Sequence, residues 1–291
     1  MNVRYFIICF SRFLIVFISA FIAEVGLVLV RSISFQLCSI AGLVVFMILT
    51  ISFLHIYRKK VNGLLIFLTV LLGACAIQIP LRIMNFRASL VSLPDFACHL
   101  LGILIGYLSF YQRGFRRSGI IGLGIGVGLF MYFKGYDYWL YKLNYGTFSG
   151  YVNNKLSIPI VGNDANGKYV NINDLKGKVV LLDFWYTRCG VCFRAFPQVQ
   201  ELYNKYKDNP SFVLYAVNHP IHSDTIGQAF YTIKSLKYSF PVLLPADKGL
   251  ADSLGVMAYP TVLVIDKDKK ILFQGDLETA EAVVAKLLKI G

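Results

Sequence analysis

Hydrophobic positions divide the chain into two parts with different patterns. Up to about residue 150, long apolar runs follow one another and are separated by short basic or turn-like breaks. From residue 151 onward the apolar runs shorten to strand length and alternate with segments of helical period, which is typical of βα units. The pattern predicts a bundle of membrane helices over 1–150 and an α/β domain over 151–291.

Five apolar runs predict five helices that cross a membrane. A crossing helix needs about 20 residues, with a usable range of about 17 to 25, so the last two runs must extend into flanking residues. The runs are 14–30, 35–57, 64–79, 97–111 and 120–133. We interpret the first as an uncleaved helix rather than a signal peptide, because its apolar region is long and no small-residue cleavage site closes it.

Basic residues in the breaks predict the orientation. Arg4 and the clusters at 58–60 and 113–117 alternate with breaks that carry fewer positive charges. Since positive clusters favour the cytoplasmic side, we expect a cytoplasmic N-terminus in the cytoplasmic (inner) membrane. Five spans then place the second domain on the periplasmic or other extracytoplasmic side, and the aromatic segment 136–141 fits an aromatic belt at that interface.

Composition and charge agree with this division. Hydrophobic residues make up 56% of the chain and charged residues 15%, and the formal net charge is +13. Residues 1–150 contain 13 Lys and Arg against 3 acids, and the remainder 16 against 13. Because most of the positive excess lies between apolar runs, it reflects topology. We therefore expect a lipid bilayer as partner and no nucleic acid.

Several residues of the apolar runs need a separate explanation. Glu24 is ionisable and costs about 2.5 to 3.5 kcal/mol at bilayer depth, so it is functional, or paired with Arg12 or Arg31, or placed near the interface. Glycines 122, 124, 126 and 128 have the spacing of close helix packing in lipid. The four cysteines of this half either relay electrons or are small buried residues; they are Cys9, Cys38, Cys75 and Cys98.

The second half predicts an alternation of strands and helices. A buried strand at 178–185 precedes a helix at 191–206, which contains Pro197 and should kink there. Beyond it we expect a strand at 211–217, a helix at 225–237, a strand at 241–244, a hairpin of 261–265 with 271–274, and a helix at 277–288.

Cys189 and Cys192 form a Cys-x-x-Cys pair, and the absence of a second such pair in the sequence favours redox chemistry over zinc. Cys189 would open a helix, where free backbone N–H groups and the helix dipole stabilise an exposed thiolate, and Arg188 would add positive potential. Cys189 is therefore expected to attack a substrate disulfide, and Cys192, one turn deeper, to resolve the mixed disulfide. His219 and His222 lack a third ligand, so we expect no metal site.

Two segments carry a resemblance to a known family. Residues 174–185 followed by the cysteine pair, and residues 258–266 around Pro260, resemble the TlpA/ResA-like thiol–disulfide oxidoreductases of the thioredoxin superfamily. The resemblance covers about 156–288 and does not extend to the membrane half. It implies a thioredoxin-like domain with a central mixed sheet, whose redox-active disulfide works without a further cofactor.

The resemblance also implies roles for residues around the pair. Asp183 stands where thioredoxins carry a buried acid that accepts the proton of the resolving thiol; the alternative is an Asp that caps or pairs at a strand end. Pro260 should be cis, in a loop that lies against the pair and binds an extended substrate with Tyr259 and Thr261. Trp185 is expected near the site, as a packing residue or a substrate contact.

These residues predict a membrane-anchored thiol–disulfide oxidoreductase that reduces disulfides in exported proteins, with electrons from a membrane donor. One alternative is a redox-sensing or transport protein with a thioredoxin-like regulatory domain. Another is a thiol peroxidase, since Thr187 lies near Cys189. The family often has Trp where this chain has Arg188, and its dipeptide differs from Gly190-Val191. Both positions tune the thiolate, so the direction of the reaction stays open.

Overall fold

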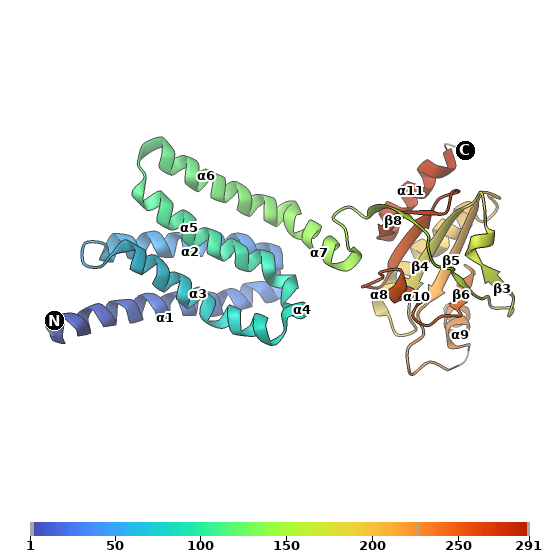
Figure 1. Cartoon of the computed structure of the whole chain (residues 1–291), viewed down its shortest axis with the longest axis horizontal. Helices are drawn as coiled ribbons and strands as arrows, with labels where there is room; N and C mark the ends of the chain where they lie inside the picture. Colours follow the sequence, from blue (N-terminus) through green and yellow to red (C-terminus); the bar gives the residue numbers. More distant parts are fainter. Residues whose placement is uncertain (1–2, 226, 290–291) are drawn as a thin grey trace. The chain divides into compact units, whose positions relative to one another are not determined.

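The structure, a computed structural model, describes the backbone of residues 3–225 and 227–289, and side chains from residue 10 onward in those ranges. The side chains of Arg4 and Cys9 lie outside this part. The chain divides into two compact units, Met1–Leu140 and Tyr141–Gly291 (Figure 1). This division falls ten residues before the boundary expected at 150/151 and lies inside the helix Tyr136–Tyr145, because Tyr141 already belongs to the second unit, where its hydroxyl donates to Asp276 at 2.9 Å.

Helices make up the first unit. They are α1 Val3–Ile33, α2 Phe35–Tyr57, α3 Gly63–Met84, the short α4 Phe86–Ser89, α5 Leu93–Tyr111 and α6 Gly114–Phe130, followed by a π-helical turn Met131–Gly135 and α7 Tyr136–Tyr145. Within the described residues, five helical stretches are long and apolar enough to cross a membrane: Phe10–Ile33, Phe35–Tyr57, Gly63–Met84, Phe86–Tyr111 and Gly114–Tyr145. The five predicted helices are confirmed, and the last two do extend into flanking residues.

Side-chain caps set the breaks between the first three helices. Ser34 separates α1 from α2, and its Oγ accepts the N–H of Leu37 at 3.1 Å. Asn62 begins α3 in the same way, since its Oδ1 accepts the N–H of Leu64 at 2.8 Å. Such caps satisfy backbone donors that have no partner inside the helix, so short polar breaks are sufficient to reverse the chain here.

Glycines allow close helix packing in this unit. A Cβ built on Gly106 of α5 would lie 2.7 Å from the backbone oxygen of Met47 in α2. On α6, a Cβ at Gly124 or Gly128 would meet Ile105 or Ile40, whereas nothing lies within 4 Å of one at Gly122 or Gly126. The packing predicted for the glycine run is thus found at two of its four positions.

The aromatic belt expected at 136–141 is wrong for Tyr136. Tyr136 is fully buried, and its hydroxyl donates to the backbone oxygen of Val91 at 2.5 Å. The indole Nε1 of Trp139 donates to the backbone oxygen of Leu90 at 2.8 Å. Both polar groups find partners in the turn that precedes α5, but Trp139 stays partly exposed, and only Tyr136 is withdrawn from an interface.

The second unit is built on an eight-stranded mixed sheet with the order β1-β8-β7-β4-β5-β6-β2-β3. The strands are β1 Tyr151–Lys155, β2 Val161–Asn163, β3 Tyr169–Asn171, β4 Val179–Trp185, β5 Phe212–Asn218, β6 Val242–Pro245, β7 Thr261–Ile265 and β8 Lys270–Gly275. The central β4 pairs in parallel with β5 and antiparallel with β7. The predicted mixed sheet is confirmed, and so is the hairpin of β7 with β8.

Helices α8 Gly190–Tyr206, α9 Gln228–Ser235, α10 Leu250–Ser253 and α11 Leu277–Lys289 cover this sheet. Alternate residues of β4 face opposite sides. Leu181 and Trp185 belong to a core shared with α8, α9 and α11, whereas Leu182 and Phe184 belong to a core shared with α10. Asp183 lies in register between Leu181 and Trp185, so its side chain faces the layer that contains α8.

Helix α9 is shorter than the helix expected at 225–237. It begins at Gln228, directly after Gly227, whose φ of 77° is left-handed. It ends at Ser235, and Lys237 also has a positive φ, of 62°. Both values lie outside the right-handed helical region, and they limit the helix to eight residues.

Candidate active site

Cys189 and Cys192 lie at the N-terminus of α8, where they form a disulfide. Cys189 is the N-cap residue, and its Sγ accepts the backbone N–H of Cys192 at 3.1 Å. The N–H of Cys189 itself donates to the backbone oxygen of Tyr186 at 3.0 Å. A sulfur in this position faces free N–H groups of the first helical turn. The helix-opening position predicted from the motif is therefore confirmed.

This position favours a negative charge on Cys189. The positive end of the helix dipole and the hydrogen bond from the Cys192 amide both stabilise a thiolate over a thiol. Cys192 is fully buried one turn further on, and Cys189 exposes only 2% of its surface in the disulfide form. The expectation of an exposed first cysteine is thus not met in this oxidised state.

Asp183 is the buried acid on the same face of the sheet. Its residue is 2% exposed, and no described group forms a hydrogen bond with its Oδ2. Burial raises the pKa of the Asp183 carboxyl to about 7, because the charged form loses its hydration. The alternative of a strand-end Asp is wrong, since Asp183 lies inside β4 opposite Ala216 of β5 and Val262 of β7.

The peptide bond between Tyr259 and Pro260 is cis, as predicted. This loop reaches the residues that precede the cysteine pair, because the rings of Tyr259 and Tyr186 meet edge to face at 5.4 Å between centroids. Burial, together with the charge of Asp252, raises the pKa of the Tyr259 hydroxyl to about 12. A neutral, half-buried phenol therefore borders the site near neutral pH.

Two of the expected substrate contacts are internal residues. Trp185 exposes no surface, and its ring packs edge to face on Phe196 of α8 at 5.3 Å between centroids. Thr261 is also fully buried, and its hydroxyl donates to the backbone oxygen of Ala258 at 2.6 Å. Both side chains support the site from within, so the expectation that they touch a substrate is wrong for this conformation.

The two residues before Cys189 differ in their surroundings. Arg188 is exposed, so its charge lies in solvent directly beside the first cysteine. The hydroxyl of Thr187 donates to the carboxylate of Asp224, which also accepts the N–H of Ile221 at 3.1 Å. Thr187 therefore stabilises the loop that follows β5, and its hydroxyl proton is used in the hydrogen bond to Asp224.

Asn218 and His219 border the site but carry no motif. The His219 ring lies 5.5 Å from the Tyr259 ring between centroids, and its backbone N–H donates to the oxygen of Trp185 at 2.7 Å. The Nδ2 of Asn218 is buried without a hydrogen-bond partner among the described residues. The one available signal was topological: these residues directly follow the strand predicted at 211–217, and parallel neighbours end at the same edge of a sheet.

Comparison with known proteins follows the same division of the chain. The Redoxin family matches residues 153–288. Thiol-disulfide oxidoreductase ResA of Bacillus thuringiensis (strain Al Hakam) is 36% identical over 129 residues, which cover 44% of this chain and 72% of that protein. ResA of Bacillus subtilis (strain 168) is 33% identical over 113 residues, which cover 38% of this chain and 59% of the relative.

Among solved structures, the exposed lipoprotein thioredoxin of Streptococcus pneumoniae strain TIGR4 is 28% identical, with a TM-score of 0.39 over 45% of this chain and 99% of that one. The Redoxin match contains the disulfide, the buried acid and the cis-proline loop. Through this thioredoxin-like domain, the chain belongs to the ResA-like thiol–disulfide oxidoreductases.

Proposed function

We propose that this protein is anchored in a membrane by its five apolar helices and reduces disulfide bonds of exported proteins at the Cys189–Cys192 pair. One observation carries the proposal: Cys189 is the N-cap residue of α8, and its sulfur accepts the amide N–H of Cys192. That geometry stabilises the thiolate from which exchange begins and holds the second sulfur within bonding distance.

In the reductive direction the pair starts as two thiols. The Cys189 thiolate attacks one sulfur of the substrate disulfide, a mixed disulfide forms, and the first substrate sulfur leaves and takes up a proton. Cys192 then loses its proton and attacks the sulfur of Cys189, which releases the second substrate thiol and restores the Cys189–Cys192 disulfide. Two electrons pass to the substrate, and a membrane electron donor returns two to the pair.

Asp183 is the proposed acceptor of the Cys192 proton. The carboxyl is buried on the face of the sheet that packs on α8, and its Oδ2 has no described hydrogen-bond partner. With a pKa of about 7, it exchanges a proton readily near neutral pH, which is the property that a general base needs. Asp183 would therefore act in the resolving step and not in the first attack.

The cis-proline loop is the proposed binding surface for an extended substrate segment. Tyr259 is partly exposed and lies against Tyr186, three residues before Cys189. A peptide placed along this loop would bring its disulfide toward Cys189. Arg188, exposed beside that cysteine, would add positive potential for an approaching thiolate or acidic segment.

The proposed location is the extracytoplasmic side of the cytoplasmic membrane. It is supported by the five apolar helices and by the basic clusters at 58–60 and 113–117, which favour the cytoplasmic side of their helices. Disulfides form and persist outside the cytosol, so a reductase for exported proteins has its substrates there.

The test uses the full-length protein, reduced and held in detergent micelles, with a disulfide-bonded protein substrate. We expect Cys189→Ser to lower reduction to the uncatalysed rate and the matched control Cys98→Ser, in the helical unit, to leave it unchanged. The reduction potential of the pair gives the direction, since about −270 mV or below is typical of reductants and about −120 mV of oxidants. Wild-type turnover in Cys189→Ser, or a potential near the second value, would refute the proposal.

A further inference from the structure

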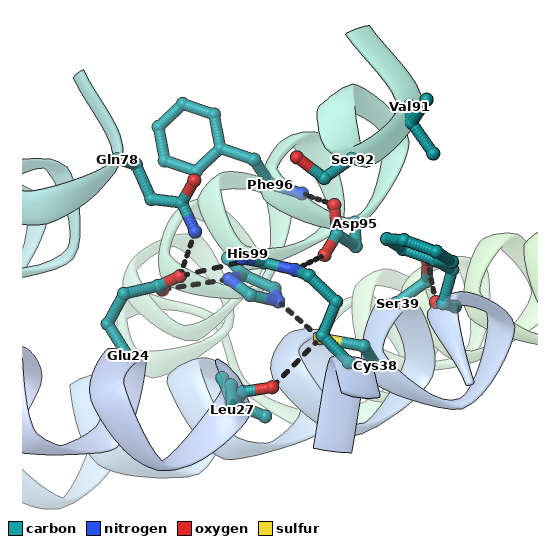
Figure 2. Close-up of polar contacts among 12 residues, drawn as sticks. Glu24, Leu27, Cys38, Ser39, Gln78, Val91, Ser92, Asp95, Phe96 and His99 are labelled. Atoms are coloured by element: carbon teal, nitrogen blue, oxygen red, sulfur yellow. Dashed lines mark hydrogen bonds and ion pairs between the residues drawn. The ribbon is translucent and has the colours of Figure 1, made fainter. Parts of the chain in front are cut away.

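Helices α1, α2, α3 and α5 of the first unit bury a cluster of polar side chains, and Figure 2 shows how these side chains point toward one another. The members are Glu24 and Arg31 from α1, Cys38 from α2, Gln78 from α3, and Asp95 and His99 from α5. Glu24, Cys38, Asp95 and His99 expose no surface at all. Polar groups buried this deeply are costly unless each has a partner, so their convergence needs a physical reason.

Three of these side chains have the spacing of a metal site. The Sγ of Cys38 lies 3.8 Å from the Nε2 of His99. One ligand atom each from Cys38, Asp95 and His99 lies within 4.8 Å of the other two. In a tetrahedral zinc site, bonds of about 2.3 Å to sulfur and 2.0–2.1 Å to nitrogen put these two atoms about 3.6 Å apart. The sulfur and the imidazole nitrogen are therefore already at ligand spacing.

The other nitrogen of His99 is held by a carboxylate. Its Nδ1 lies 2.8 Å from the Oε2 of Glu24, on the side of the ring away from Cys38 (Figure 2). Donation of the Nδ1 proton to Glu24 leaves the Nε2 lone pair directed at the Cys38 sulfur. Histidines that bind metals usually donate their second N–H to a carboxylate in this way, which fixes the tautomer and the ring orientation.

Glu24 is itself held by further partners. Its Oε1 accepts a hydrogen bond from Gln78 and lies 3.7 Å from the guanidinium of Arg31. Of the two arginines expected to pair with Glu24, Arg31 is confirmed. Nothing in the sequence indicated that His99 is a further partner of Glu24, because it lies 75 residues further along the chain. The Glu24 carboxylate therefore contacts His99 on the side of the ring opposite Cys38. It is not one of the three groups with the spacing of a metal site.

Arg31 leaves Asp95 able to bind a cation. Its Nε donates to Asp95 Oδ2 at 2.6 Å, and Oδ1 accepts the N–H of Phe96 at 2.9 Å. A carboxylate has about four lone-pair positions, so two remain. A metal-bound Cys38 would be a thiolate, so the site would hold the anionic groups of Cys38, Glu24 and Asp95. Two guanidinium groups oppose them: Arg31 contacts Glu24 and Asp95, and Arg82 donates to Gln78 at 3.2 Å. A net negative charge is left for a cation to compensate, which matters in surroundings of low dielectric constant.

We propose that Cys38, Asp95 and His99 bind one divalent transition-metal cation of the Zn²⁺ type, with Glu24 positioning His99. A thiolate and an imidazole select such borderline-soft cations over Mg²⁺ or Ca²⁺. Three protein ligands leave a fourth position for water or an exogenous group. The site is independent of the disulfide exchange proposed for the Cys189–Cys192 pair. A Cys–His–Glu arrangement can also activate a nucleophilic thiol, but Cys38 exposes no surface to a substrate.

The experiment measures Zn²⁺ binding by the full-length protein in detergent micelles, with Cys189→Ala and Cys192→Ala introduced so that this pair cannot bind metal. The protein is purified without a histidine tag, stripped with a chelator, and titrated with Zn²⁺ against a chromophoric chelator. We expect one Zn²⁺ per chain. Cys38→Ser and His99→Gln should abolish the site, and Glu24→Gln should weaken it about 10- to 100-fold.

Cys98→Ser is the matched control, because Cys98 is a second buried cysteine, adjacent in sequence to His99, and it should bind Zn²⁺ as the parent protein does. Co²⁺ provides an independent readout, since a thiolate ligand gives a sulfur-to-cobalt absorption band that Cys38→Ser should remove. Helical circular dichroism and a monodisperse elution profile verify that each variant is folded. The proposal is overturned if the folded parent protein binds no stoichiometric Zn²⁺, if folded Cys38→Ser binds it equally tightly, or if the Co²⁺ complex lacks the thiolate band.

Discussion

The rings of Tyr186 and Tyr259 meet edge to face, with 5.4 Å between their centroids. Tyr186 accepts the N–H of Cys189 through its backbone oxygen, and Tyr259 precedes the cis-proline. This contact joins the segment that precedes the cysteine pair to the cis-proline loop. The aromatic pair adds to the pairing of Thr261 with Phe184 and to the contact of Tyr259 with His219, which also hold this loop beside the first cysteine.

Loss of the Tyr259 ring is expected to weaken the binding of protein substrates. Such aromatic pairs contribute about 0.5–1.5 kcal/mol beyond the area that they bury, so Tyr259→Ala should raise KM by about 2- to 10-fold with little change in kcat. Steady-state reduction of a disulfide-bonded protein measures both constants. Tyr259→Phe keeps the ring and should behave as the wild type; an equal loss in both variants would assign the effect to the hydroxyl instead.

Removal of Cys192 should trap the reaction at its midpoint. Without the second sulfur, the mixed disulfide between Cys189 and the substrate has no intramolecular route to resolution. Cys192→Ala is therefore expected to accumulate covalent adducts with exported proteins, visible as reducible bands on a non-reducing gel. The double variant Cys189→Ser/Cys192→Ala is the control, and adducts that persist in it would assign the attack to another cysteine.

The buried Asp183 should make the thioredoxin-like domain less stable as the pH rises. Its pKa is about 7 in the folded state and about 3.9 in an unfolded chain. The folded state holds the proton more tightly, so the free energy of unfolding falls between about pH 4 and pH 7 and is level above that range. The difference corresponds to about 4 kcal/mol at most. Urea unfolding of residues 141–291 at several pH values measures this slope.

Asp183→Asn is the variant that isolates this slope. An amide does not ionise, so its free energy of unfolding should lack the decline between pH 4 and pH 7, and the variant should exceed the wild type in stability above pH 7. The same variant should slow the release of mixed disulfides near neutral pH, because Cys192 loses its proton acceptor. Parallel stability curves for both proteins would show that the Asp183 carboxyl has the same pKa in the folded and the unfolded chain.

The sequence was sufficient where local patterns determine the structure. β4 is apolar except for Asp183, and all seven of its residues are buried, as expected for a strand with both faces covered. The cysteine pair follows it at the start of a helix with a regular apolar stripe. Because a buried strand and an amphipathic helix each produce their own period, the core of the site could be placed to within a few residues.

The edge strands could not be predicted because their stability comes from pairing. β1 is mostly polar and exposed, and β2 and β3 have three residues each. These segments are extended because β8 and β6 offer free edges, through pairs such as Tyr151 with Phe273. Strand preference depends on neighbours more than on the residue itself. No local pattern marks such a strand before its partners are known.

The polar cluster of the helical unit was hidden for a different reason. Glu24, Cys38 and His99 could each be noted in the sequence, but they lie in three separate helices. Which face each helix turns to the interior depends on packing between helices, since nearly all faces of a membrane helix are apolar. Only the assembled bundle shows that His99 contacts both of the others.

The proposed orientation predicts which cysteines are reached from outside the cell. In spheroplasts treated with a mild reductant, a membrane-impermeant maleimide should label Cys189, the attacking cysteine, and should not label a cysteine introduced at Lys59. Lys59 is exposed and belongs to the basic cluster at 58–60, which favours the cytoplasmic side. Permeabilised cells should label both positions. Labelling of Lys59→Cys alone in intact spheroplasts would reverse the orientation.

Close packing of α5 on α2 predicts a sharp difference between two glycines of the helical unit. A Cβ at Gly106 would lie 2.7 Å from the backbone oxygen of Met47 and 2.9 Å from the Cβ of Thr50, so neither neighbour can yield by rotating a flexible side chain. Gly106→Ala should therefore force the helices apart, at a cost of about 1–3 kcal/mol. Nothing lies within 4 Å of a Cβ at Gly126, so Gly126→Ala should be neutral or slightly stabilising, since alanine favours the helix by about 1 kcal/mol over glycine. Thermal unfolding of the two variants in the same detergent compares them directly, and equal unfolding temperatures would contradict the close approach of α2 and α5.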